Sequence, residues 1–194
     1  MGFESFWPLA AFAVISTITP GGATTLATAS GAHFGFRRSI PLIAGIALGL
    51  ASMAAATSLG LAGVLLAAPS LQLAMKTIGS IYLIWLALRI GLSGAPNLSS
   101  GLAKPTSLIG GAWMLWHNPK GWAMTLSAAA SFAALASGPA QMAGLFGIAA
   151  TVSLVIWCLA GLLLARILRT DRQWRVLNMT LGVLVVGSVV PMWL

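Results

Sequence analysis

The sequence predicts an all-α integral membrane protein with six transmembrane helices, arranged as two inverted three-helix repeats. The first observation is composition: of the 194 residues, 59% are hydrophobic and 6% are charged, and the mean hydropathy is +0.98. Soluble domains carry roughly 25% charged residues, so these values exclude a soluble enzyme and a nucleic-acid-binding protein. The second observation is that the charges are clustered between long uncharged runs. At roughly 20 residues per span, the chain has room for about six spans.

The uncharged runs place the helices in order. Residues 39–75 and residues 121–165 contain no charged residue, and each stretch is too long for one crossing. The breakers Pro69 and Gly138-Pro139 divide them. A polar stretch, 93–105, then separates the two repeats of a single transmembrane domain. The predicted helices lie at residues 6–29, 40–67, 71–91, 107–135, 140–165 and 176–193, with repeat one at about 1–95 and repeat two at about 104–194 of the domain 1–194.

The basic residues indicate how the helices are oriented. All lysines and arginines except Lys76 and Lys120 lie in or beside the connections between helices one and two, three and four, and five and six. Cytoplasmic loops of membrane proteins carry an excess of such residues. We therefore expect these connections in the cytoplasm and both termini on the extracytoplasmic side.

Helices one and four each contain a proline motif near the middle. Thr19-Pro20-Gly21-Gly22 and Asn118-Pro119-Lys120-Gly121 lie at matching places in the two repeats. Each proline removes a backbone donor, which leaves the carbonyls of Ser16 and Leu115 without their helical partners. Such backbone is tolerated at membrane depth where it lines a cavity or is buried in protein. We therefore predict two broken helices that line a common site, with a pair of ordinary proline kinks as the alternative.

Lys120 is the charge predicted to lie deepest in the bilayer. A lysine at the centre of a membrane helix costs roughly 2.5–3.5 kcal/mol on insertion scales, so it normally faces a partner or water and marks function. Its alternative is snorkelling to an interface. His117 is a candidate for proton coupling, because histidine binds and releases protons near physiological pH; a packing histidine is the alternative.

Smaller features are interpreted as structural. The chain has two acidic residues, Glu4 and Asp171, both predicted near a membrane surface. We therefore expect no metal site, no cofactor and no acid/base enzyme. Gly45-x-x-x-Gly49 is predicted to let the second helix pack closely against a neighbour, and a homodimer is left open.

Several of these motifs together resemble the LysE/RhtB-type amino-acid exporters. The resemblance covers roughly residues 10–130 and rests on five segments in order. They are Ile18-Thr-Pro-Gly-Gly22, Ala29-Ser-Gly-Ala-His-Phe-Gly-Phe-Arg-Arg38, Gly45-Ile-Ala-Leu-Gly49, Ile81-Tyr-Leu-Ile-Trp-Leu-Ala87 and Trp116-His-Asn-Pro-Lys120. The family pattern at residues 20–22 is Pro-Gly-Pro, and this chain has Gly22 in place of the second proline. The glycine is expected to make the first break more flexible.

The resemblance implies a secondary transporter of the bacterial inner membrane, which exports amino acids or their derivatives from the cytoplasm. It also implies proton antiport and, together with the paired breaks, alternating access. A non-transporting membrane scaffold or assembly subunit, or a passive channel, are the alternatives. The expected partners are an amino acid and the lipid bilayer, with no nucleic acid. The predicted substrate-binding residues are Thr19, Pro20, Gly21, Gly22, Thr24, Asn118, Pro119 and Lys120.

Overall fold

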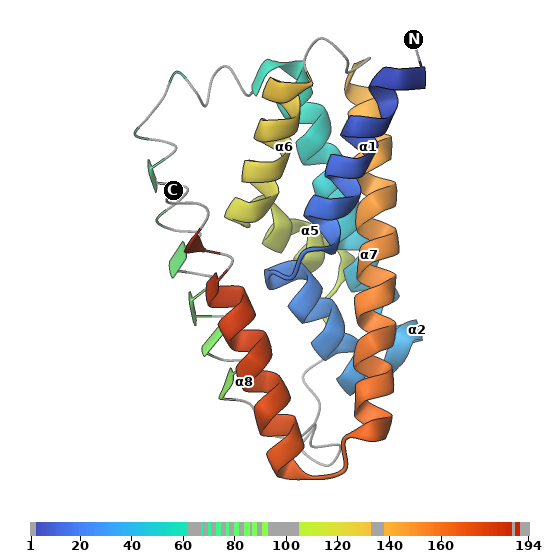
Figure 1. The fold of residues 1–194 in the computed structure, drawn as a ribbon, viewed down its shortest axis with the longest axis vertical. Helices are drawn as coiled ribbons and strands as arrows, with labels where there is room; N and C mark the ends of the chain where they lie inside the picture. The colour runs from blue at the N-terminus through green and yellow to red at the C-terminus, as the bar shows by residue number, and fades with distance from the viewer. Residues whose placement is uncertain are drawn as a thin grey trace.

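A computed structural model gives the arrangement of the helices (Figure 1). It describes residues 3–61, 105–132, 138–187 and 189–190. Between residues 66 and 93 it also describes scattered positions, namely 67, 70, 73, 74, 77, 80, 81, 84, 85, 87, 88, 91 and 92.

Helices account for almost all of these residues, and no strand occurs among them. Two predicted helices are broken in two. The predicted first helix gives α1 (Phe3–Ile18) and the start of α2, and the predicted fourth gives α5 (Leu108–Trp116) and α6 (Pro119–Ser131). The elements in chain order are α1, α2 (Gly22–Ala56), the π-helical turn η1 (Thr57–Leu61), α5, α6, α7 (Pro139–Ile167) and α8 (Asp171–Gly187).

Both breaks lie near the middle of the long axis of the molecule (Figure 1). From the N-terminus, α1 runs to this level, and α2 continues toward the opposite end before it turns back. The helix α7 runs the full length beside them, and α8 returns from the far end. Contacts are densest between α2 and α7, followed by α2 and α5, so α2 is the central element.

The connection predicted between the first two spans is a kink and not a loop. Helical residues continue from Gly22 to Ala56, and Gly35 alone departs from helical angles, with φ 76° and ψ 171°. Glycine adopts positive φ without the cost that a Cβ imposes. A single residue therefore turns the chain, and the exposed Arg37 and Arg38 follow it within the helix.

The last described helix begins earlier than predicted, at Asp171 and not at residue 176. Its start has the reciprocal capping pattern of Thr-x-x-Gln. The Gln173 side chain accepts from the amides of Arg169 (2.9 Å) and Thr170 (3.1 Å), and the Gln173 amide donates to the Thr170 hydroxyl (3.3 Å). These bonds satisfy amides that a helix start leaves unpaired. Arg172 and Arg175 therefore belong to the helix and not to the connection before it.

Glycines allow α2 to approach its neighbours closely. A Cβ on Gly45 would lie 2.8 Å from the carbonyl carbon of Leu108, and one on Gly49 would lie 3.1 Å from Ala112 Cα. The prediction that Gly45 and Gly49 serve close packing is therefore confirmed, with α5 as the neighbour. On the other side, Gly31 of α2 meets the Cys158 backbone of α7, and Gly161 of α7 meets the Thr28 backbone of α2.

The outward surface of the bundle is strongly apolar. Ile15, Leu48, Ile148 and Val183 are each more than half exposed. By length and composition, Gly22–Gly60 and Pro139–Ile167 could each cross a membrane, and Trp7–Ile18 is a shorter apolar helix. Such a surface suits lipid better than water.

Part of the prediction lies outside the described residues. This applies to about half of the predicted helix 71–91, to nearly all of the linker 93–105, and to Pro69, Lys76, Arg89 and Lys104. The inverted repeat and the orientation of the termini stay predictions.

Candidate functional site

The first break joins α1 to α2 through Thr19, Pro20 and Gly21. The helix α1 ends at Ile18 because Pro20 has no N–H to donate. Gly21 is the extended N-cap of α2, with φ −179°. Its amide donates to the Thr24 hydroxyl (2.8 Å), which in turn donates to the Gly21 carbonyl (2.9 Å). Thr24 therefore fixes the start of the second half-helix.

The second break joins α5 to α6 through His117 and Asn118. Asn118 is buried, and its side-chain oxygen accepts from the Lys120 amide (3.0 Å), so it caps α6, with Pro119 in the first turn. The Leu115 carbonyl was expected to lack a partner, and this is wrong. It accepts from the Asn118 amide at 2.8 Å, because the chain tightens as it leaves α5.

Lys120 connects the two breaks. Its ammonium group donates to the carbonyls of Thr19 (2.5 Å) and Pro20 (3.4 Å), which lie about one hundred residues earlier in the chain. The lysine stem lies against Gly21, where a Cβ would be 3.1 Å from its Cδ. The positive charge thus lies at the C-terminal end of α1, where the helix dipole is negative.

The helix α7 holds the other carbonyls at the end of α1. The buried Ser153 hydroxyl donates to the Thr17 carbonyl (2.8 Å), and the Trp157 indole donates to the Ile18 carbonyl (3.0 Å). Ser153 and Trp157 are one helical turn apart, so both lie on the face that meets α1. Four consecutive carbonyls, of residues 17 to 20, therefore accept from side chains of the second half of the chain.

Removing these α7 donors should weaken the first break. We expect Trp157→Phe and Ser153→Ala each to lower the free energy of unfolding by about 1 kcal/mol, because each leaves a carbonyl without its donor. Each should lower the Tm by about 2–4 °C in a chain of this size. The measurement is thermal unfolding in detergent. Thr151→Ala is the matched control on α7, since its exposed hydroxyl bonds only to its own helix, at the Gly147 carbonyl; an equal loss in this control would contradict the assignment.

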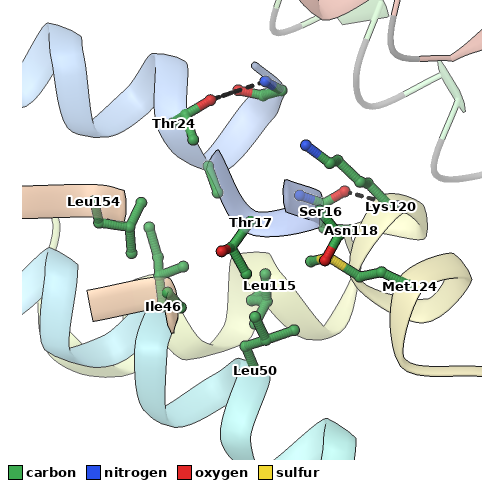
Figure 2. A pocket seen from close by; sticks show the side chains of 13 residues that line it. Ser16, Thr17, Thr24, Ile46, Leu50, Leu115, Asn118, Lys120, Met124 and Leu154 are labelled. Carbon is green, nitrogen blue, oxygen red and sulfur yellow. Dashed lines mark hydrogen bonds between the residues drawn. The ribbon is translucent and has the colours of Figure 1, made fainter. Parts of the chain in front are cut away.

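A small pocket lies between the two breaks (Figure 2). Its polar wall comes from Ser16, Thr17, Thr24, Asn118 and Lys120. The apolar wall and remaining lining residues are Gly21, Ala23, Ile46, Leu50, Leu115, Met124, Ala150 and Leu154.

The pocket is small. Its volume is about 30 Å³, which is room for about two water molecules, since one water needs about 10–15 Å³ of such space. Even a small amino acid has several times as many heavy atoms. A ligand of that size can therefore enter only when the breaks or the Lys120 side chain move.

Comparison with known proteins shows the family. The model of the LysE type translocator family matches residues 14–190. The chain belongs to the LysE type translocator family. It is similar to the cysteine/O-acetylserine efflux proteins of Escherichia coli strain K12 and Shigella sonnei, at 31% identity over 195 residues, covering 96% of this chain and 95% of theirs. The corresponding protein of Escherichia coli O139:H28 is 30% identical with the same coverage. No solved structure matches the chain.

The match confirms the resemblance seen in the sequence motifs and extends it through the last third of the chain. The family description and the names of these relatives are those of membrane transporters and not of enzymes. The apolar helices of the translocator fit this class.

The translocator brings most of the predicted site residues together. Gly21, Thr24, Asn118 and Lys120 line the pocket, and Thr19 and Pro20 contribute the carbonyls that Lys120 binds. The remaining two lie in the first turns of their helices and do not line the pocket; they are Gly22 and Pro119.

His117 lies apart from the pocket. Its ring is exposed, packs on Trp113 with centroids 4.3 Å apart, and has Nδ1 2.8 Å from the Trp113 carbonyl. Thr17 and the apolar lining residues from α7 were not predicted as part of the site, and neither were Ser153 and Trp157. Spacing offered no signal for these, because their partners are more than a hundred residues away.

Proposed function

We propose that the translocator exports a small neutral amino acid, or a derivative of one, from the cytoplasm across the bacterial inner membrane. The family and the names of its relatives support amino-acid export. The observation that carries the proposal to particular residues is the pocket between the two breaks, with Lys120 at its edge.

The pocket has the charge pattern of an amino-acid backbone. The C-terminal end of α1 offers carbonyl oxygens, which suit an ammonium group. The N-terminal ends of α2 and α6 and the Lys120 ammonium suit a carboxylate. Opposed half-helices of this kind bind zwitterionic substrates in transporters because their dipoles replace part of the lost hydration.

The transport cycle is proposed to be alternating access driven by proton antiport. The small volume of the pocket supports this, since it must widen by movement before it can hold an amino acid. His117 stays our candidate for the coupled proton, acting from outside the pocket.

The substrate should be neutral or acidic and not cationic. No carboxylate lines the pocket, so a lysine or arginine side chain would face Lys120 without an opposing charge. The cysteine and O-acetylserine named for the relatives have uncharged side chains.

The test is a panel of amino acids in liposomes that contain the purified protein, with a pH gradient imposed in either direction. We expect saturable flux of small neutral amino acids that reverses with the gradient, and little competition by arginine. Flux of no amino acid would favour a scaffold, and flux that never saturates would favour a passive channel. Competition by arginine but not by neutral amino acids would contradict the charge assignment.

A further inference from the structure

The carbonyl oxygens that bind Lys120 form a small cradle at the first break. We define the cradle as the carbonyls of Thr19 and Pro20 together with the space over Gly21, which the Lys120 side chain fills. The oxygens supply two hydrogen bonds to the ammonium group, and a Cβ on Gly21 would lie 3.3 Å from Lys120 Nζ. The ammonium group therefore shows directly which chemistry the cradle accepts: a primary ammonium with N–H donors.

The neighbouring carbonyls are held by groups that cannot leave as easily. Those of Thr17 and Ile18 accept from α7, and that of Gly21 accepts from the Thr25 amide at 2.9 Å. Only the cradle is filled by the end of a long, half-buried side chain. Thr19 is exposed, so a solute can reach the cradle once Lys120 moves.

Lys120 is held in the cradle by neutral carbonyls and not by a carboxylate. Hydrogen bonds between two ionised groups are stronger than those with one neutral partner. A carboxylate that enters the pocket would therefore attract the lysine away from the cradle. The two oxygens left behind, one exposed and one partly buried, would then be free to accept from a new donor.

We propose that the cradle is an ammonium-binding site that Lys120 occupies when no substrate is bound, and that the substrate enters by exchange. The carboxylate of the substrate takes the Lys120 ammonium, and the ammonium of the substrate takes the place of Lys120 on the Thr19 and Pro20 carbonyls. The charge of the pocket is unchanged by the exchange, since a zwitterion adds none. A molecule with only one of the two groups cannot complete it.

This inference rests on the proposed function for the identity of the substrate, but the cradle can be tested without transport. The probe is propylammonium chloride, added to the purified full-length protein in detergent. In Lys120→Ala the cradle is vacant, so the probe should raise the Tm by about 3 °C or more above the effect of equal sodium chloride. Wild type and Arg166→Ala, which loses an exposed charge in the last turn of α7, should not respond.

Two further solutes separate charge from hydrogen bonding. Tetramethylammonium has the charge without N–H donors, and propan-1-ol has the chain without the charge. Neither should raise the Tm of Lys120→Ala. An equal response to either one, or to sodium ions, would overturn the assignment of an ammonium site. An equal response in wild type, or no response to propylammonium in Lys120→Ala, would also overturn it.

The yield of folded protein provides a second measurement if Lys120→Ala is unstable. Purified with propylammonium throughout, the variant should give more monodisperse protein than with sodium chloride. Equal low yields would contradict the cradle. If propylammonium rescues the variant while the amino-acid panel shows no flux, the cradle stands and the export proposal fails. If the panel shows flux while propylammonium does not rescue the variant, export stands and the proposed exchange is contradicted.

Discussion

Replacement of Lys120 by methionine should abolish amino-acid transport while leaving the protein in the membrane. Methionine keeps an apolar stem and removes the charge, so the bilayer penalty for the lysine, roughly 2.5–3.5 kcal/mol, disappears. The substrate carboxylate then loses the one charged side chain among the residues that line the pocket. Loss of one partner from a buried, hydrogen-bonded charge pair costs about 2–5 kcal/mol, which is a reduction in flux of about 30-fold or more.

The measurement is flux into liposomes normalised to the amount of Lys120→Met protein inserted. Lys120→Arg keeps the charge but has a planar, wider head group, so it should restore little flux. Arg166→Met is the control, because it removes one positive charge at an exposed position away from the pocket. Near wild-type flux in Lys120→Met would show that the substrate is held elsewhere.

Replacement of Gly161 by valine should prevent stable packing of α2 on α7. A Cβ at this position would lie 2.8 Å from the carbonyl carbon of Thr28, and closer still to its oxygen. Both groups are on rigid helices, so the two helices must separate and lose contacts along their length. We expect the free energy of unfolding to fall by more than about 3 kcal/mol, which is at or beyond the upper end for overpacked cores. Little monodisperse protein should be recovered.

Gly144→Val on the same helix provides the comparison. A Cβ there would meet nothing within 4 Å, and valine is a better helix former than glycine. Its Tm should equal or exceed that of wild type. Equal thermal unfolding of the two variants would show that the close approach of α2 and α7 does not determine stability.

The parts of the fold that depend on local chemistry could be predicted from the sequence. Pro20 and Pro119 each remove a backbone donor beside a residue with a short polar side chain or a glycine, so both breaks were expected. Lys120 was noticed because charges are so scarce in this chain. The start of α8 also has a local signal, the capping residues Thr170 and Gln173. The charged residues beside them led to a predicted start at residue 176, which is too late.

The remaining features depend on contacts between distant residues. Ser153 and Trp157 lie 136 and 139 residues from the carbonyls they bind, and nothing in their neighbourhood distinguishes them from lipid-facing residues. Gly35 is one glycine among 22, and only the positive φ at that position shows that it turns the chain. The Asn118 amide donates to the Leu115 carbonyl because the chain tightens after α5. Counting the donors that proline removes does not predict this bond.

The most direct test of the account is whether the pocket between the breaks opens to each side of the membrane and closes around its substrate. Cys158 is the one cysteine of the chain and is buried, so Cys158→Ala gives a background without thiols. In that background, Met124→Cys places a thiol in the pocket lining. A membrane-impermeant thiol reagent should modify it from either side of the membrane, and the transported amino acid should slow the reaction. A thiol that never reacts from either side, or reacts at the same rate with and without that amino acid, would contradict the account.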